Sequence, residues 1–189
     1  MKGGRYMAGN NHKDKVPIIR TVVPLNHYQL HIEFGSGSIL DLSMANRLCT
    51  NRYYDLSNDE IFYSAVTDGS KIIFDTGTHF TLEISAREAI DRAIRNLDGS
   101  MGIQYISPLG NGQLCMEMRS GSILTLNMEY WLSTIRYSPL KEPGVLQLIS
   151  TDGENLFFGD ILTIDMEELI KLTLIIPPDR KKNDTIQEE

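Results

Sequence analysis

The stretch Ser36-Gly37-Ser38-Ile39-Leu40 occurs a second time as Ser120-Gly121-Ser122-Ile123-Leu124, 84 residues further along the chain (120 − 36 = 84). Around it, residues 24–74 align with residues 108–158 without a gap, and 21 of these 51 positions are identical. After Phe74 the second copy is four residues shorter, and the offset becomes 80. Solenoid units recur every ~20–50 residues, so a longer period with two copies predicts a tandem pair of small globular domains.

The residues around the repeated motif predict a β-hairpin. Gln29 to Phe34 alternates between polar and apolar side chains, which is typical of a strand with one buried face. Gly35-Ser36-Gly37 then supplies a three-residue turn, and residues 38–43 return as the second strand. The expected cross-strand pairs are Ile32 with Leu40, Leu30 with Leu42, and His31 with Asp41.

Each copy continues with further strands. Asp-Gly pairs at 68–69 and 152–153 mark tight turns, followed by apolar strands at 71–74 and 155–158. Another strand is predicted at 80–84 in the first copy and at 161–164 in the second. Between the hairpin and the Asp-Gly turn, residues 57–66 predict a short helix with Asn58, Asp59 and Glu60 in its first turn. The equivalent residues 141–144 allow a helix that starts after Glu142, or a loop.

A helix closes each copy. Ser85 and Asp165 are suitable N-cap residues, with Glu88 and Glu168 three positions later in capping-box register. We expect Asp98-Gly99-Ser100 to end the first helix and Pro177-Pro178 to end the second. The expected apolar stripe of the first helix comprises Ala86, Ala89, Ile90, Ala93, Ile94 and Leu97.

These elements predict an α+β protein with two tandem copies of a small antiparallel-sheet domain, each closed by a C-terminal helix. The expected boundaries are a flexible N-terminus at 1–16, a first repeat domain at 17–98, a second at 101–176, and a disordered tail at 177–189.

Composition excludes several classes of protein. The 189 residues are 41% apolar, the net charge is −7 and the pI is about 5.1. The one dense basic cluster, residues 180–182, lies in a tail that also carries acidic residues, so we expect no nucleic-acid partner. No apolar run approaches the ~20 residues that span a bilayer, and residues 1–15 lack an apolar leader segment. We therefore expect a cytoplasmic protein without a membrane partner.

The two cysteines, Cys49 and Cys115, occupy non-equivalent positions of the repeats and have no closely spaced partner. We expect both to be free thiols, and we expect neither a metal site nor a cofactor. Cys49 aligns with Ser133, which could indicate a nucleophile, yet no histidine recurs to serve as its base. Small polar residues that are buried or half-buried are therefore the better explanation of both positions.

Each copy resembles the bacterial family known as domain of unknown function 2442. In the first copy the resemblance is carried by Pro24-Leu25, the strand 30–34, Gly37-Ser38, Asp41-Leu42, Tyr53 to Leu56, and the strand 72–74. In the second copy it is carried by Pro108-Leu109, Gly121-Ser122, Tyr137 to Leu140 and the strand 156–158, with Thr125 in place of the aspartate. The resemblance extends over nearly all of 17–176. It implies a small α+β domain without an established catalytic residue set.

Three groups of residues are candidates for function. His31 and Asp41, with Glu33 nearby, could form a general-base pair or half a metal site, or an ordinary cross-strand ion pair. Arg52-Tyr53 recurs as Arg136-Tyr137, and an exposed arginine beside an aromatic residue is typical of a binding anchor. The alternative is that Tyr53 fills the core while Arg52 binds a carbonyl or Glu33.

The third group is Ile39 and its counterpart Ile123, which should point to the outer face of the hairpin beside Glu33 and Glu117. A recurring β-branched residue there indicates that this face is covered by the closing helix, by the other repeat, or by a partner.

These observations predict a non-catalytic protein-interaction module built as a tandem pseudo-dimer, with Arg52, Tyr53, Arg136 and Tyr137 as binding residues. Its partner would be another protein or a second copy of the chain. The alternative is a small-ligand binder or an enzyme with a site in the cleft between the repeats. Convergence of His31, Asp41 and His79 would favour that alternative.

Overall fold

The structure is a computed structural model that describes residues 18–100 and 102–178. The expectations for the N-terminus at 1–16 and for the tail beyond residue 178 lie outside the described residues. The strands are β1 Ile19–Leu25, β2 Gln29–Phe34, β3 Ile39–Ser43, β4 Val66–Thr67, β5 Lys71–Asp75, β6 Thr81–Ser85, β7 Ile103–Gly110, β8 Gln113–Met118, β9 Ile123–Asn127, β10 Ile149–Thr151, β11 Asn155–Phe158 and β12 Leu162–Asp165. The α-helices are α1 Asp59–Phe62, α2 Ala86–Ile94 and α3 Met166–Leu174. The predicted α+β class is confirmed.

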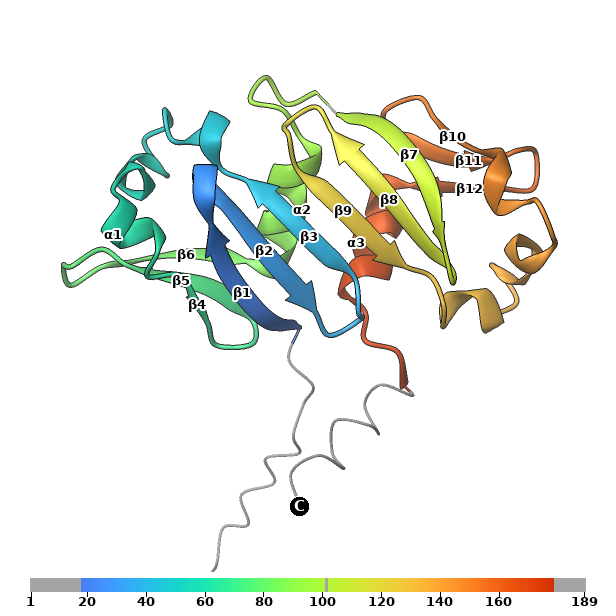
Figure 1. The fold of residues 1–189 in the computed structure, drawn as a ribbon, viewed down its shortest axis with the longest axis horizontal. Helices are drawn as coiled ribbons and strands as arrows, with labels where there is room; N and C mark the ends of the chain where they lie inside the picture. Colours follow the sequence, from blue (N-terminus) through green and yellow to red (C-terminus); the bar gives the residue numbers. More distant parts are fainter. Residues whose placement is uncertain (1–17, 101, 179–189) are drawn as a thin grey trace, which may run out of the picture.

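One antiparallel sheet of six strands runs through both halves of the chain, in the order β1-β2-β3-β9-β8-β7 (Figure 1). Two sheets of three strands, β4-β5-β6 and β10-β11-β12, flank it at opposite ends. The halves join where β3 pairs with β9, and Leu40 lies opposite Leu124. These two residues are 84 positions apart, so equivalent residues face each other across the join.

The strand pairing of the first half recurs in the second. Leu30 pairs with Leu42 and Ile32 with Leu40, as expected, and the second half pairs Leu114 with Leu126 and Met116 with Leu124 at the same offset. The pair Ile72 and Ile84 of the first flanking sheet likewise corresponds to Leu156 and Ile164 of the second. This is the pairing expected of two copies of one domain.

The repeated Ser-Gly-Ser motif connects the halves reciprocally. The Ser36 hydroxyl donates to the Thr173 carbonyl at the end of α3, at 2.6 Å, and the Ser120 hydroxyl donates to the Ala93 carbonyl at the end of α2, at 2.7 Å. Each serine thus bonds to the closing helix of the other half.

The second serine of each motif stabilises the join of the sheet. The Ser38 hydroxyl accepts a hydrogen bond from the Asn127 amide at 3.1 Å, and the Ser122 hydroxyl accepts one from the Ser43 amide at 3.0 Å. Ser38 and Ser122 are completely buried. The serine oxygens therefore complete the hydrogen bonding of two amides just beyond the ladder between β3 and β9, one buried and one part-buried.

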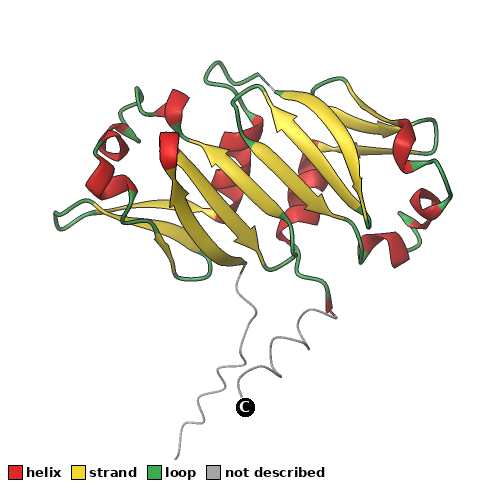
Figure 2. Cartoon of the chain, in the orientation of Figure 1, coloured by secondary structure: helices red, strands yellow, loops and turns green. Residues whose placement is uncertain are grey.

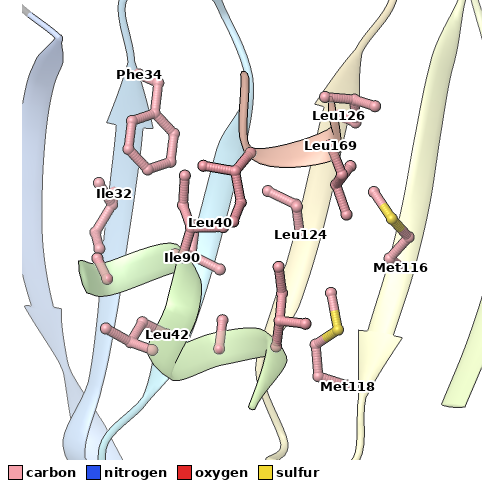
Figure 3. Packing of buried hydrophobic residues seen from close by; sticks show 14 of the residues in the cluster. Ile32, Phe34, Leu40, Leu42, Ile90, Met116, Met118, Leu124, Leu126 and Leu169 are labelled. Carbon is pink, nitrogen blue, oxygen red and sulfur yellow. The ribbon is translucent and has the colours of Figure 1, made fainter. Parts of the chain in front are cut away.

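Helices α2 and α3 lie side by side on one face of the sheet (Figure 2). Ile90 of α2 and Leu169 of α3 project toward Leu40 and Leu124 at the join (Figure 3). The buried apolar residues of both halves form a single core. The domains predicted at 17–98 and 101–176 therefore share one sheet and one core. Among the described residues, no helix has the length and apolar character needed to cross a membrane.

The predicted helix starts are confirmed, whereas one predicted end is wrong. The Ser85 and Asp165 side chains accept hydrogen bonds from the Glu88 and Glu168 amides. Helix α2 ends at Ile94, not at residue 98, so Leu97 is outside the stripe and 55% exposed. The reason lies in Arg47, whose guanidinium donates to the carbonyls of Arg92 and Arg95 and so satisfies the carbonyls that end the helix.

The short helix predicted within 57–66 is confirmed as α1, where the Asn58 side chain accepts from the Glu60 amide at 2.9 Å. Four strands were not expected from the sequence: the short β4 and β10, and the longer β1 and β7. Strands β1 and β7 each contain a proline, Pro24 or Pro108, which interrupts a strand pattern but is tolerated at a sheet edge. Both are edge strands of the six-stranded sheet.

Replacing Ser38 by alanine should lower the free energy of unfolding by about 1–3 kcal/mol, because the Asn127 amide would lose its acceptor inside the protein. Urea denaturation followed by circular dichroism measures the change. The control is Ser57→Ala, which removes an exposed hydroxyl bonded to the nearby Tyr54 carbonyl and should cost less than about 0.5 kcal/mol. Equal effects in the two variants would contradict the role assigned to Ser38.

Candidate functional site

The outer face of the six-stranded sheet, opposite α2 and α3, is a surface that both halves build together (Figure 1). Strand pairing aligns its side chains in two rows across the sheet. One row contains Val23, His31, Asp41, Ile123, Glu117 and Tyr105, and the other contains Thr21, Glu33, Ile39, Thr125, Cys115 and Ser107. We call this surface the outer sheet face.

The expected pair of His31 and Asp41 is present on the outer sheet face. The His31 Nδ1 atom lies 2.7 Å from Asp41 Oδ1, and its Nε2 atom lies 3.7 Å from Glu33 Oε1. All three side chains are partly exposed. This is the geometry of an ordinary cross-strand pair on a partly exposed surface.

The second half does not reproduce this group, because Cys115 and Thr125 replace His31 and Asp41. Burial raises the pKa of the Cys115 thiol, and the nearby charges of Glu117 and Asp41 raise it further. The thiol is therefore protonated at neutral pH, which makes it a poor nucleophile. Among the described residues, no group of three histidine, cysteine, aspartate or glutamate side chains is placed to hold a metal ion.

The Arg-Tyr pair of the first half folds back onto helix α2. The Arg52 guanidinium binds both carboxylate oxygens of Glu88, each at 2.9 Å, and also donates to the Glu83 carbonyl at 3.0 Å. The buried Tyr53 donates its hydroxyl to Glu88 Oε1 at 2.6 Å, and Arg92 donates to that hydroxyl at 3.1 Å.

The Arg-Tyr pair of the second half makes the same contacts with helix α3. Arg136 binds the Glu168 carboxylate at 2.5 and 2.6 Å, and the Tyr137 hydroxyl donates to the same carboxylate. Arg136 also donates to the Thr163 carbonyl, the counterpart of Glu83. These contacts match the alternative in which the tyrosine fills the core and the arginine binds a carbonyl, with Glu88 as its carboxylate in place of Glu33.

These contacts shift the pKa values of the participants. Burial raises the pKa of Glu168, but the hydrogen bonds from Arg136 and Tyr137 outweigh it, so the pKa lies below its usual value, and Glu88 behaves in the same way. Burial, together with the Glu168 carboxylate, raises the pKa of Tyr137 to about 12. Both arginines keep about half of the side chain exposed, so the role of Arg52, Tyr53, Arg136 and Tyr137 in binding a partner stays a prediction.

Sequence reasoning did not find Glu88 and Glu168 as partners of the arginines. Their recurrence at the offset of 80 is the signal in the sequence, but capping-box spacing accounts for it without the arginines. In the structure the amide of each glutamate is capped, while its side chain serves the Arg-Tyr pair.

A pocket of about 570 Å³ lies at the junction of the halves, with Ser120 as its contribution from the second half. Its other lining residues are Ser43, Ala45, Asn46, Arg47, Cys49, Asn96, Leu97 and Asp98. Cys49 and its counterpart Ser133 are both exposed, so the expectation that they are buried or half-buried is wrong. Each donates to a carbonyl three residues earlier, which explains why a small polar residue suits both positions.

His79 does not converge with the other candidate residues. It lies in the turn between β5 and β6, in a flanking sheet, and no interaction found among the described residues joins it to His31 or Asp41. The condition set for an enzyme in the cleft is therefore not met.

Comparison with family models, with curated proteins and with solved structures found no match to this chain. The resemblance to domain of unknown function 2442 therefore stays a prediction.

Protonation of the two glutamates should make stability depend on pH. Their folded-state pKa values are lowered, so their contribution is present above the usual glutamate pKa and is lost as the pH falls through the lowered values. Below about pH 4.5, we expect a fall in the urea concentration at which half of the protein is unfolded. This fall should be smaller in the Glu88→Gln, Glu168→Gln double variant.

The Glu154→Gln variant is the control, because this exposed side chain lies in a turn away from both arginines. It should keep the pH dependence of the unsubstituted chain. If the double variant loses as much stability at acidic pH as the unsubstituted chain, the two carboxylates do not contribute as described.

Proposed function

We propose that the chain is a non-catalytic protein-interaction module, built as a tandem pseudo-dimer, that binds a protein partner through the outer sheet face. The observation that carries the proposal is the position of Ile39 and Ile123. Ile123 is 39% exposed and Ile39 is half-buried, on the face opposite α2 and α3.

The three explanations for these isoleucines can be compared with the fold. The closing helices pack on the other face, where Leu40 and Leu124 lie. The other repeat extends the sheet edge to edge, since β3 pairs with β9, and so it does not cover this face. A partner is the explanation that remains, and apolar side chains at the centre of an open sheet are typical of a binding surface.

The chemistry of the outer sheet face indicates what the partner presents. Val23 and Tyr105, both about half exposed, lie at the two ends of the row that contains Ile123. Glu33, Asp41 and Glu117 carry negative charge between these apolar groups. A complementary surface therefore has an apolar centre with basic side chains around it.

The sheet edges are less suited to binding. The Ile19 amide donates to the Gly69 carbonyl and the Ile103 amide to the Gly153 carbonyl, so part of each edge is bonded to a flanking turn. Pro24 and Pro108 lack the amide that strand addition uses. Addition of a strand from a partner is thus disfavoured at both β1 and β7.

A ligand or substrate in the cleft between the halves is the second candidate, and the pocket of about 570 Å³ favours it. Its buried cation, Arg47, is already bonded to the carbonyls of Arg92 and Arg95, although most of the other lining residues are polar. A cytoplasmic location and membership of domain of unknown function 2442 are part of the proposal and depend on sequence alone.

Replacing Ile39 and Ile123 together by lysine should abolish partner capture, because two charges would replace the apolar centre of the outer sheet face. Affinity capture from the native host, followed by mass spectrometry and by direct titration of the identified partner, measures the loss. The control is Ile135→Lys, a change at an isoleucine that is 96% exposed in a loop of the second half.

Circular dichroism should show the same fold in both variants. If the double variant folds and binds the partner as tightly as the control, the outer sheet face is not the binding surface. If the sedimentation of the purified chain depends on concentration and that of the double variant does not, the partner is a second copy of the chain.

A further inference from the structure

The turn between β1 and β2 holds two side chains in a backbone conformation that favours glycine. His27 and Tyr28 have φ values of 61° and 56°. At the equivalent turn of the second half, Asn111 and Gly112 adopt φ values of 50° and 71°. Asn-Gly is the pair preferred in such hairpin turns, so the first half keeps larger side chains in spite of the backbone strain.

Tyr28 contributes to an aromatic cluster beside helix α1. Its ring packs edge to face on Phe62, with centroids 5.2 Å apart, and its hydroxyl donates to Asp59 Oδ1 at 3.1 Å. Tyr63 also packs edge to face on Phe62, with centroids 5.7 Å apart, and its hydroxyl donates to the Asn26 side chain at 3.1 Å. Phe62 is buried, whereas Tyr63 is 49% exposed.

These residues surround a pocket of about 340 Å³, which we call the tyrosine pocket. Its lining residues are Asn26, His27, Tyr28, Asp59, Phe62 and Tyr63. The lining contains no lysine or arginine, and Asp59 is its carboxylate. Aromatic rings with a carboxylate beside them favour a cation, because the ring faces are negative and the carboxylate supplies the opposite charge.

The second half has no counterpart of the tyrosine pocket. At the positions of Tyr28, Phe62 and Tyr63 it carries Gly112, Leu146 and Gln147. A side chain at position 112 would meet Leu132 Cδ1 at 2.9 Å, so that turn is packed closed. The pocket therefore belongs to the first half alone, which is unexpected for residues whose only role is to maintain the shared fold.

We propose that the tyrosine pocket binds a cationic side chain, an arginine or a lysine, from a protein partner. The cation would lie against the rings of Tyr28 and Tyr63 and pair with the Asp59 carboxylate. Asp55, which precedes α1, and Glu60, within α1, are both exposed and carry further negative charge in this part of the chain. This site is separate from the outer sheet face, and the test of one surface does not decide the other.

The test is an NMR titration of the full-length ¹⁵N-labelled chain with the acetylated and amidated peptide Gly-Arg-Gly-Arg-Gly. We expect saturable amide shifts at residues 26–28 and 59–63, weakened by added salt. The peptide Gly-Glu-Gly-Glu-Gly should cause no shifts there. The Asp59→Asn and Tyr63→Ala variants should each bind the arginine peptide at least tenfold more weakly, while Tyr63→Phe should stay within twofold because the ring is retained.

The matched control is Gln147→Ala, which changes the position of the second half equivalent to Tyr63 and should leave binding unchanged. The amide spectra of all variants show whether each one is folded. Shifts centred on the outer sheet face, or equal affinity in the Asp59→Asn and Tyr63→Ala variants, would overturn the proposal. If the Ile39 and Ile123 double variant no longer captures the partner but still binds the arginine peptide, the outer sheet face and the tyrosine pocket are distinct binding sites.

Discussion

The antiparallel pairing of β3 with β9 is the contact on which the rest of the structure depends. It places Leu40 opposite Leu124, merges two three-stranded hairpin units into one sheet, and brings α2 and α3 together over the join. Without it, each half would expose the apolar side of its own sheet. The paired strands meet through short segments, so buried serine hydroxyls complete the hydrogen bonding of the amides on either side. The pairing of β3 with β9 therefore both stabilises the fold and makes the outer sheet face continuous.

Equivalent positions diverge where the halves touch or serve different roles. Arg87 of α2 and Glu167 of α3 are equivalent at the offset of 80, and they form an ion pair at 2.6 Å. Two identical copies would place like charges at this contact, so the divergence favours pairing between different halves. Arg47 ends α2 through its bonds to carbonyls, whereas its counterpart Trp131 has a buried indole nitrogen without a hydrogen-bond partner among the described residues. The tyrosine pocket, found in the first half alone, follows the same trend.

Local patterns predicted most of the elements because each depends on neighbours in the chain. Strict alternation in 29–34 and the glycine turn at 35–37 set the hairpin register, and the caps at Ser85 and Asp165 set the helix starts. The edge strands β1 and β7 were not found because each contains a proline, and in β1 two valines are also adjacent. The end of α2 was misplaced because a side chain 45 residues earlier, Arg47, satisfies its last carbonyls.

The sequence by itself determined the repeat, the α+β class, the inner and outer faces of the hairpin, and the pairing of His31 with Asp41, since these follow from residue spacing within short segments. Only the tertiary structure decided how the two halves join, that Glu88 and Glu168 hold the arginines, that the closing helices leave the outer sheet face open, and that Tyr28 packs on Phe62 and bonds to Asp59. These features join residues that are 30 to 140 positions apart, and side-chain packing in the assembled core, not local backbone preference, brings such residues into contact.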